Sequence, residues 1–415
     1  MKTDVKKLRE NFSRTRQLSE HLSNLLTADD HMLQSMPEAS PTKWHLAHTS
    51  WFFDTFILKP RKIDLPVSEH FSYLFNSYYN GVGPQFKRAQ RGLISRPDLD
   101  EVWQYRFAVE EKLHHILDEL TPHELELLEL GIHHEQQHQE LIITDIKHAL
   151  SVNPLYPAVV KSFRAEDPTS TEAVGMQWQD FPTGEFRVGC DEGFCFDNEM
   201  PRHLTHVNGF RIANRPATNG EFLAFIEDQG YQRPEFWLSE GWAWLNEQRA
   251  AAPLYWQCLD GVWHTYTLAG LQPVQMNEPL CHVNYFEAHA FACWSQKRLP
   301  TEFEWEVAST IAADKGHFLD PLRLHPQPAE KRPGLLQMFG DVWEWTQSAY
   351  LPYPGYRPAP GAVGEYNGKF MVNQWVLRGG SCATPPGHVR ASYRNFFPVN
   401  ASWQFSGVRL ADDLD

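Results

Sequence analysis

Apolar residues recur at helical spacing through the first 155 residues of the chain. The first run comprises Val5, Leu8, Phe12, Leu18, Leu22, Leu25 and Leu26. The same spacing predicts three further helices, over about 41–58, 98–120 and 121–150. Thr121-Pro-His-Glu124 has the capping-box pattern of a helix start. Four long amphipathic helices predict an antiparallel four-helix bundle.

A long segment, residues 64–97, separates the second predicted helix from the third. It contains Asn76-Ser-Tyr-Tyr-Asn-Gly-Val-Gly and several basic residues. A loop of this length inside a compact domain is usually either functional or disordered. Its aromatic content argues against disorder, so a functional loop is expected.

The amino-acid composition changes after the fourth predicted helix. Residues 156–175 contain prolines, serines and threonines and are expected to be a linker between residues 1–155 and a second domain over 176–415. The second domain is rich in Gly, Pro and Trp. Strands are expected near Phe186, Trp375 and Phe405, and short helices over 219–229 and 284–296. The predicted fold class is therefore α+β, with two domains.

Composition excludes several classes of protein. A formal charge of −15 argues against a broad nucleic-acid-binding surface. No run reaches the 18 or so apolar residues of a membrane span, and the start has no signal-peptide core, so a cytoplasmic protein is expected. The six cysteines form no CxxC motif and are expected to be thiols. The oligomeric state is not visible in the sequence.

Histidines on two predicted helices form a candidate metal site. His134 and His138 lie four residues apart, one turn of the fourth helix, so both imidazoles can bind the same ion. The second helix carries His45 and His48, and either can supply the third ligand across the bundle. Three neutral histidines leave coordination positions open, as a catalytic centre requires.

The same residues match the HExxH pattern of zinc proteases, in which Glu135 would be the general base. This is the main competing interpretation. It is disfavoured because the extended metzincin pattern is absent after His138, and because a bundle helix offers no edge strand to a peptide.

Several motifs together resemble one enzyme family. They are WHLAHTSWFF, NSYYN and HHEQQHQELIITDIKH in the first half, and RLPTEFEWE, FGDVWEWT, LRGGS, YRNFF and WQFSG in the second. The chain resembles the hercynine oxygenases, the ergothioneine-type sulfoxide synthases, over nearly its whole length. The resemblance implies a DinB-like helical bundle followed by a formylglycine-generating-enzyme-like domain of the C-type lectin type.

The resemblance also implies the metal and the reaction. It places ferrous iron on His48, His134 and His138, and leaves His45 with a structural role. Members of the family use oxygen to join the sulfur of a cysteine-type thiol to the imidazole carbon of trimethylhistidine (hercynine), and form a sulfoxide. The implied partners are these small molecules, with no nucleic acid or membrane.

Site residues for the substrates follow from the same resemblance. Gln137 is expected to hydrogen-bond the imidazole of hercynine. Tyr78 and Tyr79 resemble an active-site tyrosine pair, in which a phenol donates a proton and favours C–S coupling over oxidation of the thiol alone. Arg88 and Arg91 are expected to hold the carboxylate of the thiol substrate.

The second domain is expected to supply a binding wall. Asn395, Phe396 and Phe397 match the family segment that closes over the trimethylammonium group, for which aromatic faces are suitable receptors. Formylglycine-generating enzymes use a cysteine pair, and Cys382 has no evident second partner, so this domain is not expected to be a catalyst by itself.

Three functions remain in competition at this point: the oxygenase, a zinc hydrolase on His134, Glu135 and His138, and a non-catalytic ligand-binding protein built on the second domain. Within the first, the donor is open among cysteine, γ-glutamylcysteine and a selenosugar, as in the relatives that make selenoneine.

Overall fold

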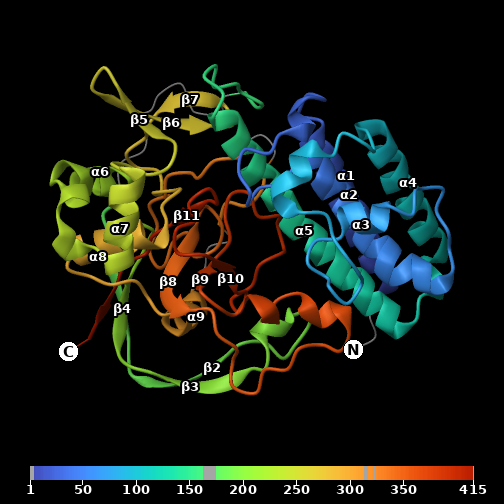
Figure 1. The fold of residues 1–415 in the computed structure, drawn as a ribbon. Coiled ribbons are helices and arrows are strands. Elements are labelled where there is room, and N and C mark those ends of the chain that lie inside the picture. The colour runs from blue at the N-terminus through green and yellow to red at the C-terminus, as the bar shows by residue number, and fades with distance from the viewer. Residues whose placement is uncertain (1–3, 162–173, 313–315, 321–322, 415) are drawn as a thin grey trace. The chain divides into compact units, whose positions relative to one another are not determined.

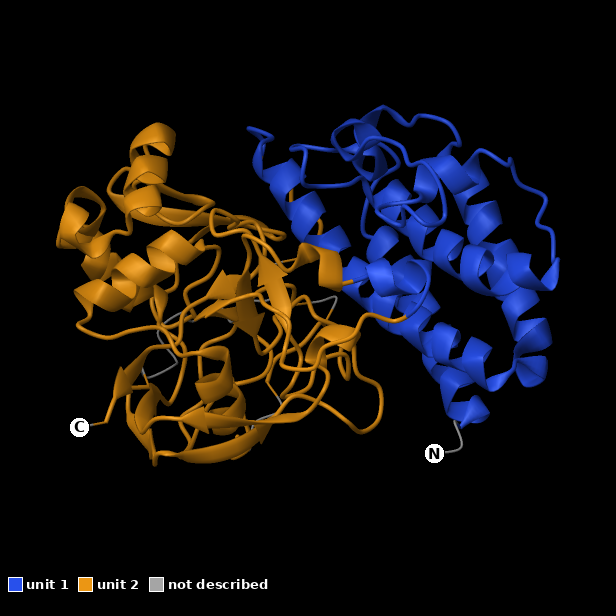
Figure 2. Ribbon diagram, turned by 60° about the horizontal axis from the view of Figure 1, so that its bottom comes forward, with its two compact units in different colours: residues 1–155, 360–366 blue, residues 156–359, 367–415 orange. Residues whose placement is uncertain are grey.

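The chain folds into two compact units. The computed structural model describes residues 4–161, 174–312, 316–320 and 323–414. Unit 1 comprises Met1–Leu155 and Pro360–Tyr366, and unit 2 comprises Tyr156–Ala359 and Asn367–Asp415 (Figure 2). Unit 1 therefore includes a short segment from far along the chain, which no local pattern predicts.

Unit 1 is a helical bundle. Its helices are α1 (Val5–Ser23), α2 (Thr42–Phe53), α3 (Phe71–Phe75), α4 (Leu99–Ile116) and α5 (Pro122–Ser151). Helix α2 packs against α4 and α5, and α1 packs against α5 (Figure 1). Helix α5 begins at the predicted capping box, in which the side chains of Thr121 and Glu124 each accept the other's backbone N–H. No helix among the described residues is long and apolar enough to cross a membrane.

Helix α2 is not the amphipathic helix that the sequence pattern predicts. All 12 of its residues are buried, because it lies inside the bundle. Its polar side chains are satisfied there: the Lys43 ammonium donates to the Pro97 carbonyl at 2.8 Å, and the Ser50 hydroxyl donates to the Leu46 carbonyl at 3.1 Å. The predicted helix reaches Leu58, but as a π-helical turn over Asp54–Leu58.

Unit 2 combines small sheets with short helices. Its largest sheet has the order β10 (Asn395–Phe397), β9 (Trp375–Arg378), β8 (Trp343–Ala349) and β11 (Ser406–Gly407). Strand β11 runs parallel to β8, and the other pairs are antiparallel. The remaining sheets are β1 (Trp178–Phe181), β4 (Phe210–Ala213) and β12 (Ala411–Asp413); β2 (Gly184–Val188) and β3 (His203–Val207); and β5 (Trp256–Leu259), β6 (Val262–Thr267) and β7 (Gly270–Pro273).

The helices of unit 2 are α6 (Asn219–Glu227), α7 (Ser239–Gln248), α8 (Tyr285–Trp294) and α9 (Glu302–Ser309). Helices α6 and α8 correspond to the two short helices expected from the sequence, whereas α7 and α9 were not expected. The helical first half and the mixed second half confirm the α+β multidomain fold class.

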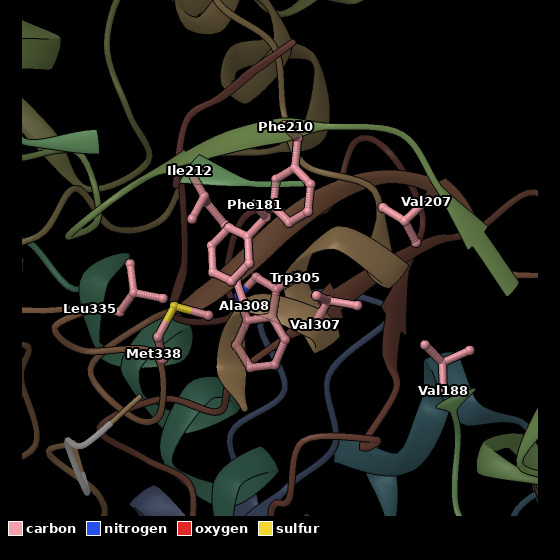
Figure 3. Close-up of a cluster of buried hydrophobic side chains, with 10 residues drawn as sticks. All are labelled: Phe181, Val188, Val207, Phe210, Ile212, Trp305, Val307, Ala308, Leu335 and Met338. Atoms are coloured by element: carbon pink, nitrogen blue, oxygen red, sulfur yellow. The ribbon is translucent and has the colours of Figure 1, made fainter. Parts of the chain in front are cut away.

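A cluster of buried apolar side chains lies between α9 and the sheet of β1 and β4 (Figure 3). The rings of Phe181 and Phe210 stack with centroids 4.9 Å apart, and Trp305 of α9 is fully buried in the same cluster. Two family motifs of the second half, RLPTEFEWE and FGDVWEWT, contribute Trp305 and Phe339 to this region. The Trp305 indole and the Arg409 guanidinium both donate to the Glu344 carboxylate, each at 2.6 Å. Glu344 of the second motif thus joins α9 to the segment that carries Arg409.

The cysteines only partly follow the sequence-based expectation. Cys190 and Cys195 form a disulfide, so the prediction of thiols is wrong for this pair. The intervening loop brings their Cα atoms to 6.2 Å, within the range that a disulfide spans. The other four cysteines carry thiols, and Cys382 is fully buried.

Glu287 in α8 is expected to make the stability of unit 2 depend on pH. It is buried, and its carboxylate accepts from the Tyr231 hydroxyl at 2.6 Å. Burial raises the pKa of Glu287 to about 7, against the lowering effect of the hydrogen bonds from Tyr231 and Asn284. A raised carboxyl pKa means that stability falls as pH rises from the unfolded-state value through 7. Between pH 5 and pH 8 the free energy of unfolding of the wild type is expected to fall by about 3 kcal/mol from this group. Glu287→Gln, which cannot ionise, is expected not to show this fall.

Urea unfolding at both pH values measures this effect. Glu221 is a matched control, because it occupies the same capping position in α6. Burial would raise the pKa of Glu221, but the Arg215 guanidinium lowers it, so this carboxyl stays ionised from pH 5 to pH 8. Glu221→Gln is therefore expected to keep the pH dependence of the wild type over this range. Equal pH dependence of wild type and Glu287→Gln would contradict the prediction.

Candidate metal centre

Three histidines from two helices of the bundle converge at one point. His48 comes from α2, and His134 and His138 come from α5. Each offers a ligand atom, and these atoms lie within 4.8 Å of one another. The Nε2 atoms of His48 and His134 are 3.2 Å apart, and all three side chains are buried. The structure thus brings together the residues predicted as ligands, and it places His48, not His45, in the cluster.

The surroundings of the imidazoles direct ring nitrogens into the cluster. The Nδ1 atom of His48 lies 2.6 Å from the Phe75 carbonyl oxygen, which can only accept, so Nδ1 carries the proton and Nε2 is left as a ligand atom. The rings of Trp44 and Trp51 stack on the two sides of His48, at centroid distances of 4.5 and 5.5 Å. His48 is therefore fixed in both position and tautomer.

The charge state of the cluster suits a metal. Burial lowers the pKa of all three imidazoles, and that of His134 falls to about 3. The imidazoles are thus neutral at neutral pH, which is the form that binds a metal ion. A set of three neutral nitrogen donors fits ferrous iron and also zinc, so the donor atoms alone do not select the ion.

Glu135, the base of the competing hydrolase interpretation, is engaged elsewhere. Its carboxylate accepts from Arg16 at 2.9 Å, from Arg106 at 2.6 Å and from Ser19 at 2.6 Å. Burial would raise the pKa of Glu135, but Arg106 and Arg16 lower it to about 2. A carboxylate held by two buried guanidinium groups is a poor general base at neutral pH. This geometry disfavours the zinc hydrolase.

The tyrosine pair lies on the loop after α3. Asn76 shapes this loop, because its amide donates to the Tyr79 carbonyl at 3.1 Å and to the Gly83 carbonyl at 3.0 Å. Tyr79 is fully buried and stacks on Tyr78 with a centroid distance of 4.8 Å. Burial raises the pKa of Tyr79 well above its ordinary value, so its phenol stays protonated.

The segment from residues 360–366 adds a third tyrosine that sequence reasoning missed. The Glu365 carboxylate accepts from the backbone amides of Asn80 at 3.0 Å and Gly81 at 2.7 Å, which holds this segment to the tyrosine loop. The Tyr366 ring lies 5.7 Å from the His134 ring, and its hydroxyl donates to the side-chain oxygen of Gln137. About 230 residues separate Tyr366 from Gln137, and no local pattern marks their contact.

The two predicted carboxylate-binding arginines have different environments. Arg91 is buried, with its guanidinium carbon 3.3 Å from the ring centroid of Trp44. It donates to the Ser40 and Ser77 hydroxyls at 2.9 and 3.3 Å, and the described residues supply it with no ion pair. Arg88 is exposed and donates to a backbone carbonyl, that of Glu38. Of the two, Arg91 has the better geometry for binding a substrate anion.

The predicted aromatic wall lies in unit 2. Asn395, Phe396 and Phe397 form β10, which pairs with β9. Phe396 stacks on Tyr350, with a centroid distance of 4.0 Å and an interplanar angle of 12°. The role of these three residues at the metal centre stays a prediction.

Comparison with known proteins identifies the family. The Sulfatase-modifying factor enzyme 1-like domain matches residues 180–327 and 321–414. The chain is 32% identical to hercynine oxygenase from Mycolicibacterium smegmatis, with 95% of this chain and 96% of that protein covered. It is also 32% identical to hercynine oxygenase from Mycolicibacterium thermoresistibile, with coverages of 91% and 89%. Ergothioneine biosynthesis protein 1 from Schizosaccharomyces pombe is 23% identical, with 94% of this chain and 54% of that protein covered.

The fold, the site and these relatives together define an oxidoreductase that joins a histidine-bearing helical bundle to a sulfatase-modifying-factor-like domain. Within that class, the chain belongs to the hercynine oxygenase family. The resemblance inferred from the sequence motifs is thereby confirmed.

Proposed function

We propose that this protein is an iron- and oxygen-dependent sulfoxide synthase of ergothioneine biosynthesis. The observation that carries the proposal is the buried cluster of His48, His134 and His138 in a chain of this family. In the reaction, the imidazole C–H and the thiol S–H bonds are replaced by a C–S bond. One atom of O₂ goes to the sulfur and the other leaves in water, which balances the atoms and electrons. Ferrous iron on the three histidines supplies the activation of oxygen.

Gln137 and Tyr366 are proposed to bind hercynine. Gln137 lies on α5 between the proposed ligands His134 and His138. Its side-chain oxygen accepts from the Tyr366 hydroxyl. This hydrogen bond uses the amide oxygen as an acceptor, and the NH₂ group is proposed to donate to a ring nitrogen of the substrate. Asn395, Phe396 and Phe397 are proposed to close over the trimethylammonium group, as the resemblance implies.

Arg91 is proposed to bind the carboxylate of the sulfur donor. A buried guanidinium with no carboxylate partner among the described residues favours an anionic ligand, since burying a lone charge is costly. Arg91 stacks on Trp44, which in turn stacks on His48, one of the proposed ligands, and this supports the proposal. Arg88 is proposed to give weaker, solvent-exposed support.

The tyrosines are proposed to control the proton that accompanies C–S coupling. Tyr78, Tyr79 and Tyr366 form a continuous aromatic group, because Tyr78 stacks on Tyr79 and lies 6.3 Å from the Tyr366 ring. The Tyr366 ring lies 5.7 Å from the His134 ring. A protonated phenol here can donate to an oxygen-derived group during the reaction.

The function is tested with the purified protein loaded anaerobically with Fe(II), then mixed with hercynine, a donor and air. Oxygen consumption and a thioether sulfoxide in the product are expected with cysteine or γ-glutamylcysteine. A competing selenosugar donor distinguishes selenoneine synthesis from sulfur transfer. Arg91→Gln is expected to raise KM for cysteine about 10- to 100-fold but to have a smaller effect on cysteamine, which lacks a carboxylate. Arg88→Gln is the matched control.

Absence of any sulfoxide with both thiols, in iron-loaded protein, would overturn the proposal. Equal effects of Arg91→Gln on cysteine and cysteamine would instead assign Arg91 a structural role. Both measurements use the full chain.

A further inference from the structure

His45 lies directly behind one of the proposed ligands. It is buried, at 2% exposure, on the same helix as His48. Its Nδ1 atom is 2.8 Å from Nδ1 of His138, and its Nε2 atom is 3.1 Å from Oδ2 of Asp145. The same Asp145 oxygen accepts from the backbone amide of Ser40 at 2.8 Å. His45 thus connects a proposed ligand to a buried carboxylate that the backbone holds in place.

The chemistry of these groups fixes the direction of the hydrogen bonds. A carboxylate only accepts, so Nε2 of His45 must donate to Asp145. In a neutral imidazole the other nitrogen then carries a lone pair, so Nδ1 of His45 accepts from Nδ1 of His138. This leaves the proton of His138 on Nδ1 and the lone pair of its Nε2 for the metal. The whole chain of bonds is satisfied with both histidines neutral.

The three proposed ligands have unequal support on their outer sides. His48 donates to a backbone carbonyl, and His138 donates to the His45–Asp145 pair. Nδ1 of His134 is buried with no hydrogen-bond partner among the described residues. A hydrogen bond from the outer nitrogen of a ligand histidine orients the ring and strengthens it as a donor, and the effect is larger when the acceptor is itself bonded to a carboxylate.

We infer that His45 and Asp145 are positioning residues for the metal centre: they form a hydrogen-bond chain that sets the tautomer and orientation of His138 and raises its affinity for the ion. The inference rests on the proposed metal centre but not on the substrates or the reaction. It assigns the first histidine of the HLAH pair a definite role, which is to act through His138 without touching the metal.

The test uses the metal alone. Co(II), which has visible absorption bands that report ligand geometry, and anaerobic Fe(II) are titrated into the full-length protein against a competing chelator. His45→Phe keeps a ring of similar size but removes both hydrogen bonds. It is expected to weaken metal binding about 10- to 100-fold, and to shift the Co(II) bands. Asp145→Asn keeps the shape of the side chain and is expected to have an effect in the same direction near the lower end of that range.

His31→Phe is the matched control, because His31 is also buried in unit 1. Its imidazole hydrogen-bonds the Ser23 hydroxyl at 2.6 Å and the Thr27 carbonyl at 2.7 Å, away from the cluster. It is expected to lower thermal stability while leaving the metal Kd and the Co(II) spectrum unchanged.

Metal Kd values within twofold of the wild type, with unchanged Co(II) bands, in folded His45→Phe and Asp145→Asn would overturn the inference. If His45→Phe does not fold, Asp145→Asn decides alone. The outcome is separate from the proposed function: a wild type that binds Co(II) but makes no sulfoxide contradicts the reaction and leaves this inference standing.

Discussion

Replacement of His134 by alanine is expected to abolish the oxygen consumption of the iron-loaded protein while leaving the fold intact. His134 contributes one of three clustered ligand atoms. Losing a residue that hydrogen-bonds a ligand lowers metal affinity roughly 10- to 100-fold. Losing a ligand itself costs more, so iron affinity is expected to fall by at least about 100-fold. Of the three ligands, His134 is the best choice for this test. The Nδ1 atom of His134 has no hydrogen-bond partner among the described residues. On that side of the ring, the substitution therefore breaks no hydrogen bond.

Iron content after anaerobic reconstitution, metal Kd and oxygen uptake measure the effect. His133→Ala is the matched control, because His133 is the preceding residue on α5 and lies outside the cluster. It is expected to bind iron and consume oxygen like the wild type. A His134→Ala protein that retains both properties would remove the metal centre from this site.

Replacement of Glu135 by glutamine is expected to have the largest effect on the stability of unit 1. The Glu135 carboxylate is the shared partner of Arg16 and Arg106, all three of which are buried. Removing one partner of a buried ion pair leaves uncompensated charge, which costs about 3–5 kcal/mol. The free energy of unfolding, measured in urea, is therefore expected to fall by that amount, while iron binding in the folded fraction is retained.

The same variant separates the two enzyme classes. In a zinc hydrolase, the folded Glu135→Gln protein would lack its general base and be inactive. In the oxygenase, the folded fraction is expected to stay active, although the protein is less stable. Glu110→Gln is the control, because Glu110 also accepts from Arg16, at 2.6 Å, but is partly exposed. The free energy of unfolding of Glu110→Gln is expected to be lower than that of the wild type by about 1 kcal/mol or less. An unfolding free energy of Glu135→Gln within about 1 kcal/mol of the wild type would contradict the prediction.

The different fates of His134, Glu135 and His138 follow from helix geometry. Residues four apart lie on one face of a helix, whereas adjacent residues point about 100° apart. The two histidines therefore share one face of α5, and Glu135 faces the helix α1 that carries Arg16. The HExxH pattern contains the histidine spacing of a metal site, but the pattern alone does not say which way its glutamate is directed.

The sequence by itself determined the features that depend on neighbouring residues. Backbone hydrogen bonding fixes 3.6 residues per turn, so periodicity located the long helices, the capping box at Thr121 and the pairing of His134 with His138. The motifs then supplied the resemblance that the comparisons confirm. These inferences needed no knowledge of how distant segments meet.

Only the tertiary structure decided the contacts between distant segments. It buried Arg91 without a carboxylate partner among the described residues, enclosed Glu135 between two arginines, and placed His45 between His138 and Asp145. It also brought Tyr366 to Gln137, although about 230 residues separate them. Such contacts depend on which surfaces meet when the helices pack, and local periodicity carries no information about that choice.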